Sequence, residues 1–132
     1  MPLGWSPSLA IGVEEIDAQH EELFRRAERL VRALRTGDRA GVDALFTYLA
    51  GYAEKHFLVE ERLMEAAGYP GLDAHRSAHA RFRADLDAHL RAYAADGGNA
   101  GAGLALHNWL SDWLREHLAG LDQELGRYLS RR

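Results

Sequence analysis

The sequence of 132 residues contains no cysteine, only three prolines and a single lysine, Lys55. Without cysteine the protein has no disulfide framework, no thiolate zinc site, no iron–sulfur cluster and no cysteine nucleophile. Long apolar runs are also missing, and none approaches the length needed to cross a bilayer. The N-terminal residues up to Trp5 lack a basic region followed by an apolar stretch. We therefore predict no secretory signal, no membrane insertion and a cytoplasmic location.

The charge pattern gives little sign of a charged partner. The formal net charge is −4, and acidic residues alternate with arginines along the chain. No basic stripe is interleaved with aromatic residues, so nucleic acid is not an expected partner. The length fits a single domain over residues 1–132, with enough chain to bury a core without a structural metal.

Apolar residues recur at spacings of three and four, which is typical of amphipathic helices. We predict an irregular arm over residues 1–14, held by Trp5. Four helices follow, at about 16–36, 40–67, 71–95 and 102–130. The glycine-containing segments 36–38, 68–71 and 96–99 mark the turns between them. No segment alternates with a period of two. The pattern predicts an all-α fold, an up-down-up-down antiparallel four-helix bundle.

Histidine, which occurs seven times, and acidic residues interrupt each apolar stripe. His20 and the His56/Glu60 pair lie almost equally far along the chain from the first turn, and His79 and His117 from the third. In an antiparallel bundle, equal distances from a turn correspond to equal depth. The groups that share this depth are His20, His56, Glu60, His75, His79, His117 and Asp122. His89 and His107 lie further along their helices, so we do not expect them to be ligands.

Burying so many polar groups without partners is costly, whereas a metal would satisfy them. The set is too large for one tetrahedral zinc, and a mixture of imidazole and carboxylate suits iron better than manganese or a zinc pair. Seven ligands suggest two ions, bridged by Glu60, Asp122 and a solvent oxygen. Three histidines would then complete six-coordination at one ion, and two would leave the other with an open position.

Four motifs resemble the hemerythrin family, in particular its bacterial, single-domain members. They are IDAQH at residues 16–20, HFLVEE at 56–61, HRSAH at 75–79 and WLREH at 113–117, followed by Asp122. The resemblance implies that His75, His79 and His117 bind one iron and that His20 and His56 bind the other. It further implies bridging by Glu60, Asp122 and an oxo or hydroxo group, and reversible binding of O2 rather than enzymatic turnover.

The residues around the layer favour binding over turnover, because a dry pocket would protect bound O2. The expected pocket residues are Leu23, Phe24, Leu63, Trp113 and Leu114. Two other functions stay open. A di-iron oxidase or ferroxidase is one, although such sites are rich in carboxylates with Glu-x-x-His pairs. The other is an O2 or redox sensor that acts through a protein partner. The sequence does not specify the oligomeric state.

Two local details have structural consequences. His117 and Asp122 are five residues apart, which places them about 140° apart around a regular helix. We therefore expect a π-type turn or a helix break near Gly120. Glu61 follows Glu60 directly and should point about 100° away from it, so we expect it on the surface.

Overall fold

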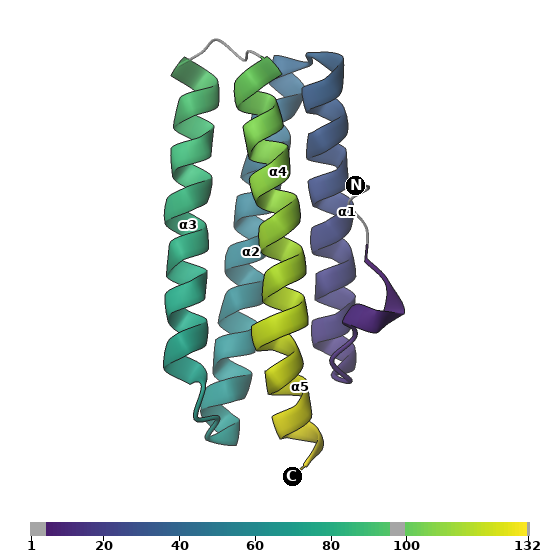
Figure 1. The fold of residues 1–132 in the computed structure, drawn as a ribbon, viewed down its shortest axis with the longest axis vertical. Coiled ribbons are helices and arrows are strands. Elements are labelled where there is room, and N and C mark those ends of the chain that lie inside the picture. Colours follow the sequence, from purple (N-terminus) through teal and green to yellow (C-terminus); the bar gives the residue numbers. More distant parts are fainter. Residues whose placement is uncertain (1–4, 96–99, 132) are drawn as a thin grey trace.

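The computed structural model describes residues 5–95 and 100–131, which form four long helical rods beside one another (Figure 1). A short 3-10 turn, η1 (Pro7–Leu9), precedes the bundle. The first three rods are α1 (Glu14–Thr36), α2 (Arg39–Ala67) and α3 (Leu72–Ala95). The fourth is composite and consists of α4 (Ala100–His117), the π-helical segment η2 (Leu118–Asp122) and α5 (Gln123–Ser130). Each rod begins and ends within two residues of its predicted bounds, and the predicted turn at 96–99 lies outside the described residues.

Short local signals set the helix ends. α1 ends at Gly37, which takes the left-handed conformation with φ 71°, and α2 ends at Gly68 in the same way with φ 66°. At the start of α2, the Asp38 carboxylate accepts a hydrogen bond from the backbone N–H of Gly41 at 3.0 Å. These tight connections place consecutive helices antiparallel.

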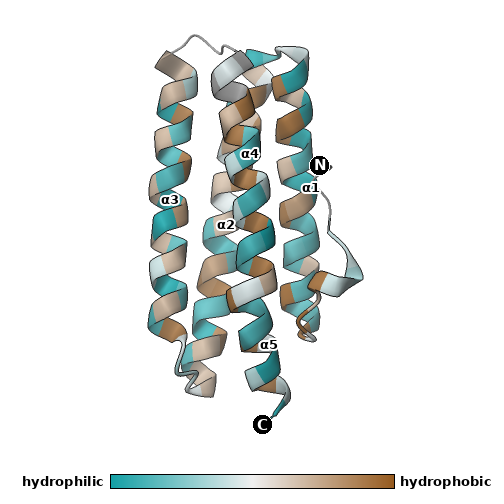
Figure 2. Cartoon of the chain, in the orientation of Figure 1, coloured by the Kyte–Doolittle hydropathy of each residue, from teal (hydrophilic) through white to brown (hydrophobic). Residues whose placement is uncertain are grey.

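The helices pack in the order of the chain, and α4 closes the bundle against α1. Figure 2 shows that each helix carries both hydrophilic and hydrophobic residues along its length, as expected of helices that bury one face. The predicted all-α antiparallel bundle is therefore confirmed. Among the described residues, no helix combines the length and hydropathy that a membrane span requires.

Two apolar clusters make up the core, and a polar layer separates them along every rod. The larger cluster contains Leu23, Phe57, Phe82 and Leu114, and the smaller one is formed by Ile11, Ile16, Met64 and Leu125. On α1, for example, His20 lies between Ile16 of the smaller cluster and Leu23 of the larger one. The core is thus apolar at both ends and polar between them.

The N-terminal arm lies against the bundle beside α1 (Figure 1). Trp5 packs against the larger cluster, as predicted. The Asp17 carboxylate accepts hydrogen bonds from the backbone N–H groups of Ile11 at 2.8 Å and Gly12 at 3.2 Å. The Gln123 side-chain amide donates to the carbonyl of Ala10 at 3.0 Å. The arm is therefore fixed to both α1 and α5 next to the polar layer.

Candidate metal centre

The polar layer gathers side chains from all four rods. Each of its members has between 0 and 6% of its surface exposed. The members are His20 from α1, His56 and Glu60 from α2, His75 and His79 from α3, His117 from α4 and Asp122 from η2. The structure thus brings together all seven residues that the sequence placed at one depth.

Three histidines face one side of the two carboxylates. The Nδ1 atom of His75 lies 3.0 Å and the Nε2 atom of His79 lies 3.5 Å from Oε1 of Glu60. Oδ1 of Asp122 lies 3.3 Å from Nε2 of His117 and 3.7 Å from Nδ1 of His75. Glu60 and the three histidines can each direct one ligand atom to a common point.

The other two histidines face the opposite oxygens of the same carboxylates. Oε2 of Glu60 lies 3.0 Å from Nε2 of His56 and 3.6 Å from Nε2 of His20. Oδ2 of Asp122 lies 3.2 Å from Nε2 of His20. Each carboxylate therefore presents one oxygen to the group of three histidines and one to the group of two, as expected of groups that bridge two cations.

The hydrogen bonding of this layer is incomplete. Among the described residues, seven buried side-chain polar atoms have no hydrogen-bond partner, and all but the indole nitrogen of Trp5 belong to the layer. They include Oε2 of Glu60, both oxygens of Asp122 and the Nε2 atoms of His79 and His117. Buried polar atoms normally have a hydrogen-bond partner. Carboxylate oxygens and imidazole nitrogens that lack one, and that lie close together, are suitable ligand atoms for a cation. The residues therefore fit a pair of metal ions.

The π-helical segment explains how His117 and Asp122 reach the same layer. Its wider turn accommodates the five-residue separation that a regular α-helix would spread around its circumference. The predicted π-type turn is confirmed, and Gly120 lies within it. The Leu121 carbonyl in the same segment accepts a hydrogen bond from Nε2 of His75 at 3.0 Å, which leaves Nδ1 of that ring facing the carboxylates.

A second group of contacts orients the histidines from outside the layer. The side-chain amide oxygen Oε1 of Gln19 lies 2.7 Å from Nδ1 of His56, and Oε2 of Glu61 lies 2.7 Å from Nδ1 of His79. Such partners fix the ring orientation and tautomer of a metal-binding histidine. The expectation that Glu61 is a surface residue was wrong: only 18% of its side chain is exposed, because α3 packs beside it.

The layer shifts the pKa values of its own members. Burial alone would lower the pKa of His20, but contacts with Asp122 and Glu60 outweigh it and raise the pKa to about 9. Burial also lowers the pKa of His56, whereas the contacts of His75 with Glu60 and Asp122 outweigh burial and raise its pKa. For Glu60, burial is outweighed by the surrounding histidines, which hold its pKa well below the usual value. The metal-free layer therefore retains protons at neutral pH.

Four of the five predicted pocket residues lie on the side of the layer that faces the larger cluster. They are the buried Leu23, Phe24 and Leu114, and the half-buried Trp113. The Trp113 ring stacks on His117, with centroids 4.4 Å apart and an interplanar angle of 12°. Leu63 packs instead against the smaller cluster. A hollow of about 550 Å³ between α3 and the fourth rod is lined in part by Trp113 and His117.

The remaining two histidines stay apart from the layer, in agreement with the sequence. The His89 ring lies against Trp109, with centroids 5.0 Å apart. His107 is half-buried, and burial together with the charges of Arg35 and Arg115 lowers its pKa. Neither residue belongs to a potential metal-binding group among the described residues.

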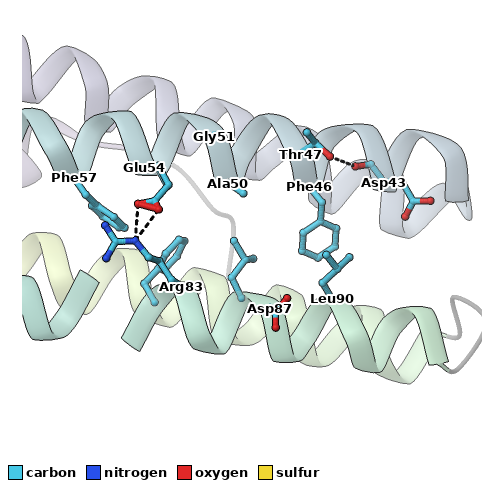
Figure 3. Close-up of a pocket in the computed structure, with 13 residues that line it drawn as sticks. Asp43, Phe46, Thr47, Ala50, Gly51, Glu54, Phe57, Arg83, Asp87 and Leu90 are labelled. Atoms are coloured by element: carbon cyan, nitrogen blue, oxygen red, sulfur yellow. Dashed lines mark hydrogen bonds and ion pairs between the residues drawn. The ribbon is translucent and has the colours of Figure 1, made fainter. Parts of the chain in front are cut away.

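A groove lies away from the layer, between α2 and α3 (Figure 3). Its volume is about 710 Å³, and Phe57 and Phe82 line it. The Phe57 ring also stacks on His79, with centroids 3.8 Å apart and an interplanar angle of 11°. One aromatic ring thus separates the groove from the layer.

Comparisons with known proteins agree with this geometry. Residues 11–129 match the model of the hemerythrin HHE cation binding domain family. The chain is 34% identical over 122 residues to a bacteriohemerythrin of Stenotrophomonas maltophilia, covering 92% of this chain and 77% of that one. It is 33% identical to a bacteriohemerythrin of Ralstonia nicotianae, covering 97% and 89%. A hemerythrin of Siphonosoma cumanense is 31% identical, covering 92% and 88%.

The fold has a close counterpart among solved structures. The crystal structure of a point mutant superposes on this chain with a TM-score of 0.82 at 25% sequence identity. The match covers 96% of this chain and 97% of the other.

Proposed function

The chain belongs to the hemerythrin family, and from that premise we propose that it binds O2 reversibly at a centre of two iron ions. The observation that carries the proposal is that the two carboxylates separate the five histidines of the layer into a group of three and a group of two. Glu60 and Asp122 each direct one oxygen to three histidines and the other to two. This arrangement supports two cations with unequal numbers of ligands and one open position.

In this proposal His75, His79 and His117 would hold one iron and His20 and His56 the other, and Glu60 and Asp122 would each offer one oxygen to either ion. The iron pair would supply the redox chemistry by lending electrons to O2 on binding and recovering them on release. Gln19 and Glu61 orient His56 and His79 through their outer nitrogens. The protein thus fixes the ligand positions before O2 arrives.

The apolar residues beside the layer exclude water from the place where O2 would bind. Leu23, Phe24 and Leu114 are each 2 to 3% exposed, and Trp113 covers His117. Exclusion of water slows proton delivery, which protects a bound oxygen species from being lost as a reduced product. This supports a carrier over an oxidase, as does a donor set with five histidines and only two carboxylates. Sensing of O2 through a partner protein would use the same site. The cytoplasmic location of the protein stays a prediction.

The test is to load the metal-free protein with ferrous iron under anaerobic conditions, count iron per chain, admit O2 and then remove it. We expect two irons per chain and a visible absorption band that appears with O2 and disappears on sparging with inert gas. The His117→Ala variant should bind less iron, whereas His89→Ala, a histidine outside the layer, should behave as the wild type. Irreversible oxidation would favour the oxidase or redox-sensor function, and fewer than two irons in the wild type would contradict the ligand assignment.

A further inference from the structure

The side chains of the polar layer are covered on three of the four sides of the bundle. Between α1 and α2, Oε1 of Gln19 lies 2.7 Å from Nδ1 of His56. Between α2 and α3, Oε2 of Glu61 lies 2.7 Å from Nδ1 of His79. The N-terminal arm is fixed by hydrogen bonds to both α1 and α5, and so it spans the side that these two elements form. The remaining side lies between α3 and the fourth rod.

On that side the structure has the hollow of about 550 Å³ that Trp113 and His117 line. Three short side chains of α3 face it, namely Ala74, Ser77 and Ala78. Bulkier residues at these positions would fill the space, so their small size leaves the hollow open. The hollow therefore gives an approach from the surface to the edge of the layer.

His117 is the member of the layer that this approach reaches. It is 6% exposed, whereas each of the other six members is 2% exposed or less. None of the seven lines the groove between α2 and α3 or the cavity beside Trp5. An ion that arrives from the solvent through the hollow therefore meets His117 first among the proposed ligands.

The polar groups at the hollow can bind a cation and can change its rate of approach. Glu116, which precedes His117 in the chain, lines the hollow with an exposed carboxylate, and Ser77 adds a hydroxyl group. Oxygen atoms of this kind are ligands that hydrated divalent ions accept readily. Arg81 lines the hollow as well, and its positive charge opposes the approach of a cation.

The backbone at His117 is the point where the fourth rod leaves regular α-helical geometry. This residue ends α4 and caps the π-helical segment η2. Short π-helical segments are rare and occur frequently at functional sites. Within the layer, Nε2 of His117 has no hydrogen-bond partner among the described residues. The ring can therefore turn towards the hollow and back without breaking a hydrogen bond at that atom.

We propose that divalent metal ions enter and leave the layer through this hollow. A hydrated ion first exchanges one water molecule for the Glu116 carboxylate and then another for the imidazole of His117, which passes the ion to the other ligands. The exchange changes no oxidation state, and the displaced water returns to the solvent through the same opening. The proposal rests on the proposed function in one respect, namely that the layer holds metal ions.

The test is the rate at which the metal-free protein takes up Co²⁺, whose visible absorption changes on binding. Ala78→Leu narrows the hollow at a half-buried position and should slow uptake at least about tenfold. Because one opening serves both directions, release of Co²⁺ to an excess of chelator should slow by the same factor, and the dissociation constant should not change. The matched control Ala84→Leu adds the same side chain at an exposed position of α3 outside the hollow and should take up Co²⁺ as fast as the wild type.

The charges at the hollow give a second test that does not alter its width. Glu116→Gln should slow the uptake of Co²⁺ and Arg81→Gln should speed it, each by roughly two- to fivefold at low ionic strength. Both effects should shrink at high ionic strength, because salt screens exposed charges. The control Asp112→Asn removes an exposed carboxylate of α4 outside the hollow and should have a smaller effect.

Uptake by Ala78→Leu at the rate of Ala84→Leu would overturn the proposal. Slower uptake combined with faster release would also overturn it, because that combination shows a damaged ligand set and not a narrowed entrance. If circular dichroism shows that Ala78→Leu does not fold, Ser77→Leu at an exposed position of the hollow replaces it. Irreversible oxidation of the iron-loaded protein would contradict the proposed function and leave the Co²⁺ test valid, whereas a protein that binds no Co²⁺ would overturn both.

Discussion

Among the single residues outside the proposed ligand set, Glu61 makes the most informative contact with the layer. Its carboxylate lies 2.7 Å from Nδ1 of His79 and also 3.5 Å from Arg76. We predict that Glu61→Ala weakens iron binding roughly 10–100-fold, because loss of such an orienting partner has this typical effect. Glu61→Gln keeps a hydrogen-bond acceptor at this position, so its affinity for iron should fall less.

Iron affinity would be measured by competition with a chelator. The matched control is Glu65→Ala, which removes an exposed carboxylate of the same helix that lies 3.4 Å from Arg76. If Glu61→Ala and Glu65→Ala retained iron equally well, the orienting role of Glu61 would be wrong.

Leu114 carries a different prediction, about the lifetime of the O2 complex. Its side chain is 2% exposed and belongs to the larger cluster beside the layer. Leu114→Ala should admit water next to the site and speed autoxidation, at a cost of about 2–5 kcal/mol in unfolding free energy. The rate is read from the loss of the O2-dependent band at a temperature where the variant is folded. Leu49→Ala, an equally buried leucine of the same cluster on α2, controls for destabilisation, and equal autoxidation rates in the two variants would contradict the role of Leu114.

Among the secondary-structure elements, α5 approaches the arm most closely at a glycine, in addition to the hydrogen bond from Gln123 to Ala10. A Cβ atom at Gly126 would lie 2.5 Å from the carbonyl oxygen of Ile11 and 2.8 Å from its Cβ atom. Gly126→Ala should therefore displace the arm and lower the unfolding free energy by about 1–3 kcal/mol, less any gain in helix propensity. Urea unfolding measures this change. Gly51→Ala, where the added methyl meets open space, should be neutral or stabilising, and equal effects would show that the arm is not fixed at this contact.

The elements also show what the sequence could and could not predict. The direction of a side chain on its own helix follows from spacing, so the depth of His20 and the need for a wider turn before Asp122 were both predictable. Which residues of a neighbouring helix contact that side chain does not follow from spacing along its own helix. Glu61 points away from Glu60, yet α3 places His79 beside it. Leu63 lies beyond Glu60 towards the C-terminal end of α2, where the smaller cluster is, and this depth did follow from its spacing.

The whole molecule is expected to fold without metal, because the apolar clusters on both sides of the layer do not depend on it. We predict that removal of iron leaves the helical content largely intact but lowers the melting temperature. A ligand at a hundred times its dissociation constant adds about 2.7 kcal/mol of stability, so the loss should be at least of this order. Circular dichroism of loaded and stripped protein measures both quantities. Complete unfolding on removal of iron would show that the layer, and not the apolar core, maintains the fold.

The metal-free protein should also respond to pH through its buried layer. The folded state raises the pKa of His20 from 6.5 to about 9, so this contribution to stability is complete below pH 6.5 and is lost as the pH rises through 9. The raised pKa of His75 acts in the same direction. The lowered pKa of Glu60 gives stability that is present above pH 4.5 and lost in more acidic solution, and the lowered pKa of His56 opposes folding below pH 6.5. From pH 6.5 to 9 the stripped protein should therefore lose stability, by on the order of 3 kcal/mol for His20.

Iron binding should have the opposite pH dependence to the stability of the metal-free protein, because a histidine must release its proton before it can bind a metal. Iron affinity should therefore rise between pH 6.5 and 9, and binding should release protons that calorimetry in buffers of different ionisation enthalpy can count. Urea unfolding of stripped His20→Gln should show a smaller loss over the same interval, whereas His89→Gln should retain the wild-type slope. A wild-type slope in His20→Gln would mean that the proton resides elsewhere in the layer, and the assignment to His20 would be wrong.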